Sequence, residues 1–117
     1  MAISRYSGSY SYQYEVSKVV KRSSVRQERL LRIFGSNIRR WRRVNGMSAT
    51  TLAERAFITR ETLRNIETGT GTPRIDSLFA VLTALGIADT VITAVDPYNN
   101  QAARARIDDI LGTGEAP

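Results

Sequence analysis

The chain has no cysteine and no histidine. The lack of cysteine excludes disulfides and thiolate zinc sites, and the lack of histidine excludes catalytic arrangements that depend on an imidazole. No apolar run approaches the roughly 18 residues needed to cross a bilayer. The N-terminus also has no apolar core of the kind found in a signal peptide. We therefore expect a soluble cytoplasmic protein, associated with the nucleoid if it binds DNA, with no metal and no cofactor.

Basic residues are abundant and unevenly distributed. The 117 residues carry a net charge of +6, and the pI is about 10.3. Residues 1–85 hold 15 Lys and Arg against 6 Asp and Glu, whereas residues 86–117 hold 2 against 5. A basic body suits a polyanionic partner and an acidic tail suits a different surface, although basicity alone can equally serve solubility.

Residues 1–25 form an N-terminal extension rich in tyrosine and serine. Apolar residues occupy most even positions from Tyr10 to Val20, which is the alternation of a β-strand. A lone strand cannot bury its face. Three alternatives are open: a disordered extension, a strand that stabilises a dimer, or an arm whose basic residues reach phosphate.

A helix is predicted from about residue 26 to residue 45. Gly46 stands where a left-handed C-cap is usual, and Gly35 interrupts the helix at a point where another helix could approach closely. Steps of three and four define its apolar stripe, which consists of Leu30, Leu31, Phe34, Ile38, Trp41 and Asn45.

Two short amphipathic helices follow, over residues 48–56 and 59–67. Each opens on a hydroxyl residue, Ser48 or Thr59, that can cap it. Their apolar stripes are Leu52, Ala53 and Ala56 in the first helix and Leu63 and Ile66 in the second.

The second of these helices turns polar side chains away from its apolar stripe. Arg and Asn carry paired hydrogen-bonding groups that match guanine and adenine edges in the major groove. A packed helix pair with such a face is typical of helix-turn-helix DNA binding. The candidate base-reading residues are Arg60, Glu61, Thr62, Arg64 and Asn65.

A further helix is predicted from residue 75 or 76 to residue 85, burying Leu78, Val81, Leu82 and Leu85. Residues 87–95 form another apolar segment, either a short helix or a strand. Residues 26–97 thus constitute the predicted domain. Residues 98–117 form an acidic tail with one short helix over 101–111.

Residues 31–95 resemble the lambda-repressor/Cro-like (Xre-type) helix-turn-helix family. The shared features are an Arg-rich first helix, Gly46-Met47-Ser48, Leu52-Ala53, Thr59, Ile66-Glu67-Thr68-Gly69, Pro73 and Ala84-Leu85-Gly86. The resemblance implies an all-α, five-helix domain whose third helix enters the major groove. One departure is Ala49, where the family commonly has a glutamine that contacts the DNA backbone and braces the recognition helix. Base specificity therefore does not transfer from other members.

The resemblance also assigns roles to individual residues. Phosphate contacts fall to Arg39, Arg43, Thr70 and Arg74, and Ser48, Thr50 and Thr59 belong to the same DNA-binding set. It further implies an internal ion pair between Arg42 and Glu67. The alternative is that these two residues are independent surface charges.

Within the family, the chain looks most like the HipB-type antitoxins, on the basis of Asp96-Pro97 and Ala103-Arg104-Ala105-Arg106. That resemblance implies a homodimeric repressor of its own operon, bound to a pseudo-palindromic operator and to a HipA-like kinase toxin. The alternatives are a protein-interaction module for which DNA binding is secondary, and a stand-alone phage or host regulator. No enzymatic activity is expected, because no nucleophile–base pair accompanies the carboxylates of the recognition helix.

Two apolar segments near the C-terminus are candidates for contacts with another protein chain. Ile87, Val91, Ile92 and Val95 are expected at a dimer interface, and the alternative is that they close the core of the monomer. The narrow apolar stripe of residues 101–111 is expected either to dock into a protein partner or to pack back on its own domain.

Overall fold

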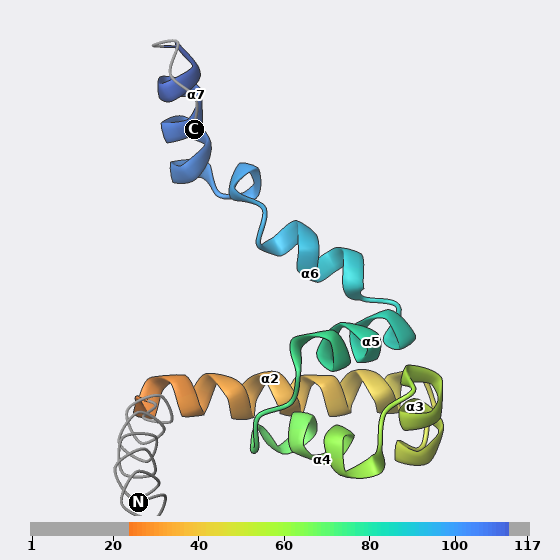
Figure 1. Cartoon of the computed structure of the whole chain (residues 1–117). Helices are drawn as coiled ribbons and strands as arrows, with labels where there is room; N and C mark the ends of the chain where they lie inside the picture. The colour runs from red at the N-terminus through yellow and green to blue at the C-terminus, as the bar shows by residue number, and fades with distance from the viewer. Residues whose placement is uncertain (1–23, 113–117) are drawn as a thin grey trace, which may run out of the picture.

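The computed structural model describes residues 24–112, which form α-helices joined by short turns (Figure 1). In chain order the elements are α2 (Val25–Val44), α3 (Ala49–Ala56), α4 (Arg60–Thr68), α5 (Ile75–Leu85), α6 (Ala88–Ala94), the 3-10 helix η1 (Pro97–Asn99) and α7 (Gln101–Gly112). No strand occurs in this part of the chain, so the all-α prediction is confirmed. The strand predicted within residues 1–25 lies outside the described residues.

Hydroxyl side chains begin the first three helices. Ser24 Oγ accepts from the backbone N–H of Gln27, Ser48 Oγ from Thr51 and Thr59 Oγ1 from Thr62, each at 3.0 Å. These bonds satisfy donors that have no partner within the helix. Local sequence therefore determines where α2, α3 and α4 start.

The segment whose structure the sequence left open is a helix. The Ile87 N–H bonds to the Leu82 carbonyl, and the Val91 N–H bonds to the Ile87 carbonyl. The chain thus passes from the C-terminus of α5 directly into α6. The β-branched residues of this segment do not make it a strand, because no neighbouring strand is present in residues 24–112 to pair with it.

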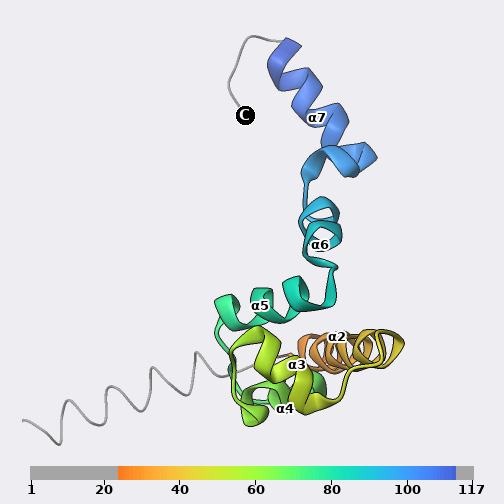
Figure 2. The ribbon, with the colours of Figure 1, turned by 90° about the vertical axis from the view of Figure 1, so that its right-hand side faces the viewer.

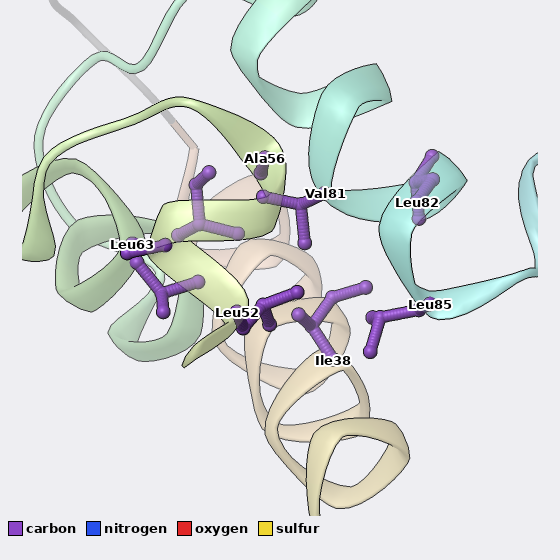
Figure 3. Packing of buried hydrophobic residues seen from close by; sticks show 9 residues of the cluster. Ile38, Leu52, Ala56, Leu63, Val81, Leu82 and Leu85 are labelled. Carbon is purple, nitrogen blue, oxygen red and sulfur yellow. The ribbon is translucent and has the colours of Figure 1, made fainter. Parts of the chain in front are cut away.

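The core lies where α2, α3, α4 and α5 meet, and its buried side chains are drawn in Figure 3. The fully buried large residues are Ile38, Leu52, Leu63, Val81 and Leu82. All the core residues predicted for α3, α4 and α5 are buried except Leu78, which is half-buried. The apolar periodicity of these three helices therefore identified the packed faces correctly.

The predicted stripe of α2 is only partly covered. Ile38 is buried and Phe34 is half-buried, but Leu30, Leu31 and Trp41 remain 50%, 48% and 44% exposed. Helix α6 leaves the body instead of crossing this side of α2 (Figures 1 and 2). Of the stripe that periodicity defines on α2, only the middle, at Phe34 and Ile38, therefore packs inside the domain.

Helices α6 and α7 with η1 form an arm that projects from the body (Figure 2). Helix α6 packs on α5, and α7 packs mainly against η1. No single helix among residues 24–112 is long and apolar enough to cross a membrane; α5 and α6 together reach that length and apolarity but are bent by 118°.

Helices α2 and α4 approach each other closely at Gly35. A Cβ atom on Gly35 would lie 2.2 Å from the Ile66 carbonyl oxygen and 2.7 Å from that of Glu67. These atoms belong to the backbone and cannot move aside individually. The absence of a side chain at residue 35 therefore sets the distance between the two helices, as the sequence predicted.

An ion pair joins the same two helices. Arg42 Nε donates to Glu67 Oε2 at 2.7 Å, and Arg42 Nη2 donates to Glu67 Oε1 at 3.1 Å. Arg42 Nη1 donates to the Met47 carbonyl at 3.1 Å. The two charged side chains are 12% and 9% exposed, and the hydrogen bond to Glu67 raises the pKa of Arg42 above its usual value. The internal pair implied by the family resemblance is thus present in bidentate form.

Gly35→Ala should destabilise the protein. Alanine normally improves a helix interior by about 1 kcal/mol relative to glycine, but here the methyl group must push α4 away, a strain of about 1–3 kcal/mol. Thermal unfolding followed by circular dichroism measures the difference. Ser36→Ala, at the exposed neighbouring position, is the control and should not lower the Tm. A higher Tm for Gly35→Ala would contradict the close approach.

Glu67→Gln should lower stability by about 3 kcal/mol, because it leaves the largely buried Arg42 charge without its counterion. Chemical denaturation gives the free energy of unfolding. The matched control is Glu61→Gln on the exposed side of the same helix, which should change that free energy by less than about 0.5 kcal/mol. Equal effects of the two substitutions would show that the ion pair contributes nothing.

Candidate nucleic-acid interface

The outer face of α4 is polar. Leu63 and Ile66 point into the core, whereas Arg60, Glu61 and Arg64 are exposed. Thr68, one turn after Arg64, is exposed on the same face. Sequence reasoning missed Thr68, although its spacing of four from Arg64 was the signal that could have found it.

A shallow hollow lies beside this face, between α2, the start of α3 and α4. Its lining residues are Arg39, Arg42, Ala49, Arg60, Glu61, Leu63, Arg64, Glu67 and Thr68. The charges of Arg42 and Glu67 compensate each other, so three arginines face one glutamate in the remainder of the hollow. A positive concavity of this kind attracts a phosphate group. The small Ala49 side chain leaves the hollow open on the α3 side.

A hydrogen bond links the first turns of α3 and α4 beside Ala49. Arg60 Nη1 donates to Thr50 Oγ1 at 2.7 Å. This contact connects the two helices next to the position where the family commonly has glutamine. Ser48, on the other side of Ala49, caps α3 and also donates to Thr51 Oγ1.

Besides Arg60, two further candidate base-reading residues have internal hydrogen-bond partners. Thr62 Oγ1 accepts from Thr59 Oγ1 at 3.0 Å. Asn65 is half-buried, and its Oδ1 accepts from Thr70 Oγ1 at 3.4 Å. The Asn65 amide also lies so close under Gly71 that a Cβ there would be 2.8 Å from its nitrogen. Both side chains thus serve the turns at the two ends of α4, which the sequence pattern did not indicate.

The predicted phosphate-binding residues are exposed, but they are not equivalent. Arg39 and Arg43 lie on α2, with only Arg39 lining the hollow. Arg74 donates from Nε to Asp76 Oδ1 at 3.1 Å and from Nη2 to Oδ2 at 3.2 Å. These hydrogen bonds raise the pKa of Arg74 and lower that of Asp76. Arg74 therefore offers phosphate a partly compensated charge.

The turn between α3 and α4 contains an unusual residue. Phe57 has φ of 56°, in the left-handed region, and its side chain is 94% exposed. That conformation costs a residue with a side chain about 1–2 kcal/mol and favours glycine. Phe57 was not singled out in the sequence, because its strain depends on the turn geometry.

No group of three or more potential metal-ligating side chains occurs among residues 24–112. The hollow beside α4 contains two carboxylates, and one of them is already paired with Arg42. The arrangement therefore suits binding of an anion rather than a cation.

Comparison with known proteins identifies the domain in the middle of the chain. A comparison with curated proteins gave no match, and one with solved structures gave none either. Residues 38–91, which run from the middle of α2 into α6, match the family model described as helix-turn-helix. This segment includes the α3–α4 pair and the Arg42–Glu67 contact. Residues 38–91 are therefore a helix-turn-helix domain of the lambda-repressor-like (Xre) family of DNA-binding regulators.

Proposed function

We propose that this protein is a homodimeric, sequence-specific transcriptional repressor that binds a pseudo-palindromic duplex operator. The observation that carries the proposal is the packed α3–α4 pair, whose exposed face combines Arg64 and Glu61 with the positive hollow at Arg39. Arg and Glu are side chains that read guanine and cytosine edges in the major groove. The hollow gives the same face an affinity for the DNA backbone.

Each part of this interface has a distinct role in the proposal. Helix α4 enters the major groove, with Arg64 and Glu61 contacting bases, and Arg39 and Arg43 contact phosphates. Arg60 positions the start of α4 through Thr50 and keeps its remaining donors for DNA. The Arg42–Glu67 pair prevents α4 from shifting on α2. Thr70 is exposed beside the C-terminal end of α4 and completes the phosphate contacts.

The homodimer part of the proposal rests on the exposed half of the α6 segment. Ile87 and Val91 are half-buried against the core of their own chain, so they serve the monomer. Ile92 and Val95 are 53% and 72% exposed and are the contacts we assign to a second copy. A two-fold dimer would place its half-sites about 10 bp apart, one helical turn of the duplex.

The projecting arm favours an additional role as an autoregulating antitoxin. Helix α7 packs mainly against η1, so it is well placed to meet a second protein. On this proposal a HipA-like kinase toxin binds the tail, and repression and toxin inhibition are linked. If DNA binding proves unspecific, an interaction module with secondary DNA binding becomes the better description. The test is inhibition of a kinase-like protein encoded next to this chain.

Arg64→Ala should weaken binding to the preferred site by about 1–3 kcal/mol and relax discrimination at one base position. Arg39→Ala should weaken all sequences about equally and reduce the slope of log affinity against log salt by about 1. Site selection from random duplexes, followed by fluorescence anisotropy at several salt concentrations, measures both effects.

Arg55→Ala is the matched control for these variants. It removes one positive charge from an exposed position of α3 that does not line the hollow. We expect it to leave base preference unchanged and to lower affinity less than either interface substitution. Equal affinity of the unsubstituted protein for selected and random DNA would refute sequence-specific binding.

A chain ending at Pro97 should keep its Tm and its affinity for DNA. The truncation removes α7 and most of η1, which pack mainly against each other and contribute no residue to the core, so the free energy of unfolding should change by less than about 0.5 kcal/mol. Differential scanning calorimetry and anisotropy provide the two readouts. A marked fall in Tm would show instead that the tail belongs to the fold.

A further inference from the structure

Helix α2 has an apolar stripe that no other part of residues 24–112 covers. The stripe consists of Leu30, Ile33, Trp41 and Val44, which are 50%, 49%, 44% and 75% exposed. Asn37 lies between them, and the spacing of 0, 3, 7, 11 and 14 residues places all five on one side of the helix. Exposed apolar surface of this extent commonly marks an interface.

The stripe is separate from the DNA-binding face. On a helix with 100° between successive residues, Asn37 lies about 140° from the mean direction of Arg39 and Arg43. Ile38, which is buried in the core, lies between the stripe and the side of α2 that bears Arg39 and Arg43. A partner bound to the stripe would therefore leave the hollow and α4 free for DNA.

The charge around the stripe restricts what can cover it. Helix α2 contains seven arginines and one glutamate. Arg40 lines two shallow hollows along the stripe, one with Trp41 and Val44 and the other with Arg29 and Ile33. Pairing two α2 stripes would bring like charges together, which is unfavourable. The stripe therefore fits an apolar helix that carries carboxylates.

The outer side of α6 has that chemistry. Ile92 and Val95 are exposed there, together with the carboxylates of Asp89 and Asp96. No lysine or arginine occurs between Arg74 and Arg104. Helix α6 projects from the body and does not lie along α2 of its own chain (Figures 1 and 2).

We propose that the α2 stripe of one copy binds the outer side of α6 from a second copy. The apolar residues of the two helices pack together, and Arg29 and Arg40 face Asp89 and Asp96. The reciprocal contact of the other two helices closes a two-fold dimer without leaving a free interface. The inference rests on the homodimer in the proposed function and names the surface that receives the arm.

The chain offers a clean cross-linking test, because it has no native cysteine. Val44→Cys and Ile92→Cys proteins are mixed as full-length chains under mild oxidation, and the disulfide-linked products are identified by mass. The mixed dimer should be the main product. Phe57→Cys is the control: its position is 94% exposed but lies on the α3–α4 turn, and it should give little cross-linking with either variant.

Trp41, the only tryptophan, gives a second readout from within the stripe. Its emission should shift to shorter wavelength as the protein concentration rises and the stripe becomes covered. Ile92→Asp and Val44→Asp should each weaken self-association by at least about tenfold, whereas Phe57→Ala should not. Sedimentation velocity measures the association directly.

Each other outcome overturns the inference in a recognisable way. A main product of two Val44→Cys chains would show that the α2 stripes pair with each other. In a variant that carries both Val44→Cys and Ile92→Cys, an intrachain disulfide in monomers would show that the arm folds back on its own body. A dimer with neither cross-link would place the interface elsewhere, with the homodimer retained. A monomer at all concentrations would refute the homodimer as well, while specific DNA binding is tested separately by anisotropy.

Discussion

The close approach of α2 and α4 is the constraint on which the rest of the structure depends. At Gly35 the absent side chain lets the α4 backbone lie against α2, and seven residues later Arg42 holds Glu67 through two hydrogen bonds. The contact at Gly35 sets the distance between α2 and α4, and the Arg42–Glu67 pair fixes how the two helices are aligned along each other. Since α4 carries the proposed DNA-binding face, packing inside the protein fixes the orientation of that face before DNA binds, which reduces the ordering cost of binding.

The same architecture divides the polar residues of α4 between support and recognition. Thr62 and Asn65 make hydrogen bonds to the turns at either end of the helix, and Arg60 holds the start of α3. Arg64 and Glu61 remain as exposed side chains without such ties. Three of the five candidate base-reading residues thus serve positioning, so on the proposed function base discrimination depends on Arg64 and Glu61, and substitutions there should have large effects.

Charge and exposure also divide the chain into a basic body and an acidic arm. The body presents arginines on α2 and α4, while α6 carries carboxylates beside Ile92 and Val95. One side of α2 lines the hollow beside α4 through Arg39, and another side bears the exposed stripe that includes Trp41 and Val44. On the two proposals, α2 contributes to two basic surfaces on different sides of the helix, one for DNA phosphate and one for the acidic outer side of α6.

The sequence by itself determined the local elements: the helix starts at Ser48 and Thr59 and the buried faces of α3 to α5. Hydrogen bonds and periodicity within a few residues govern these features. Only the tertiary structure decided that Trp41 is exposed, that Asn65 turns toward Thr70 and that Arg60 reaches Thr50. Each of these side-chain positions depends on where another segment of the chain lies. The direction in which α6 leaves α5 likewise depends on tertiary packing, which no local sequence pattern encodes.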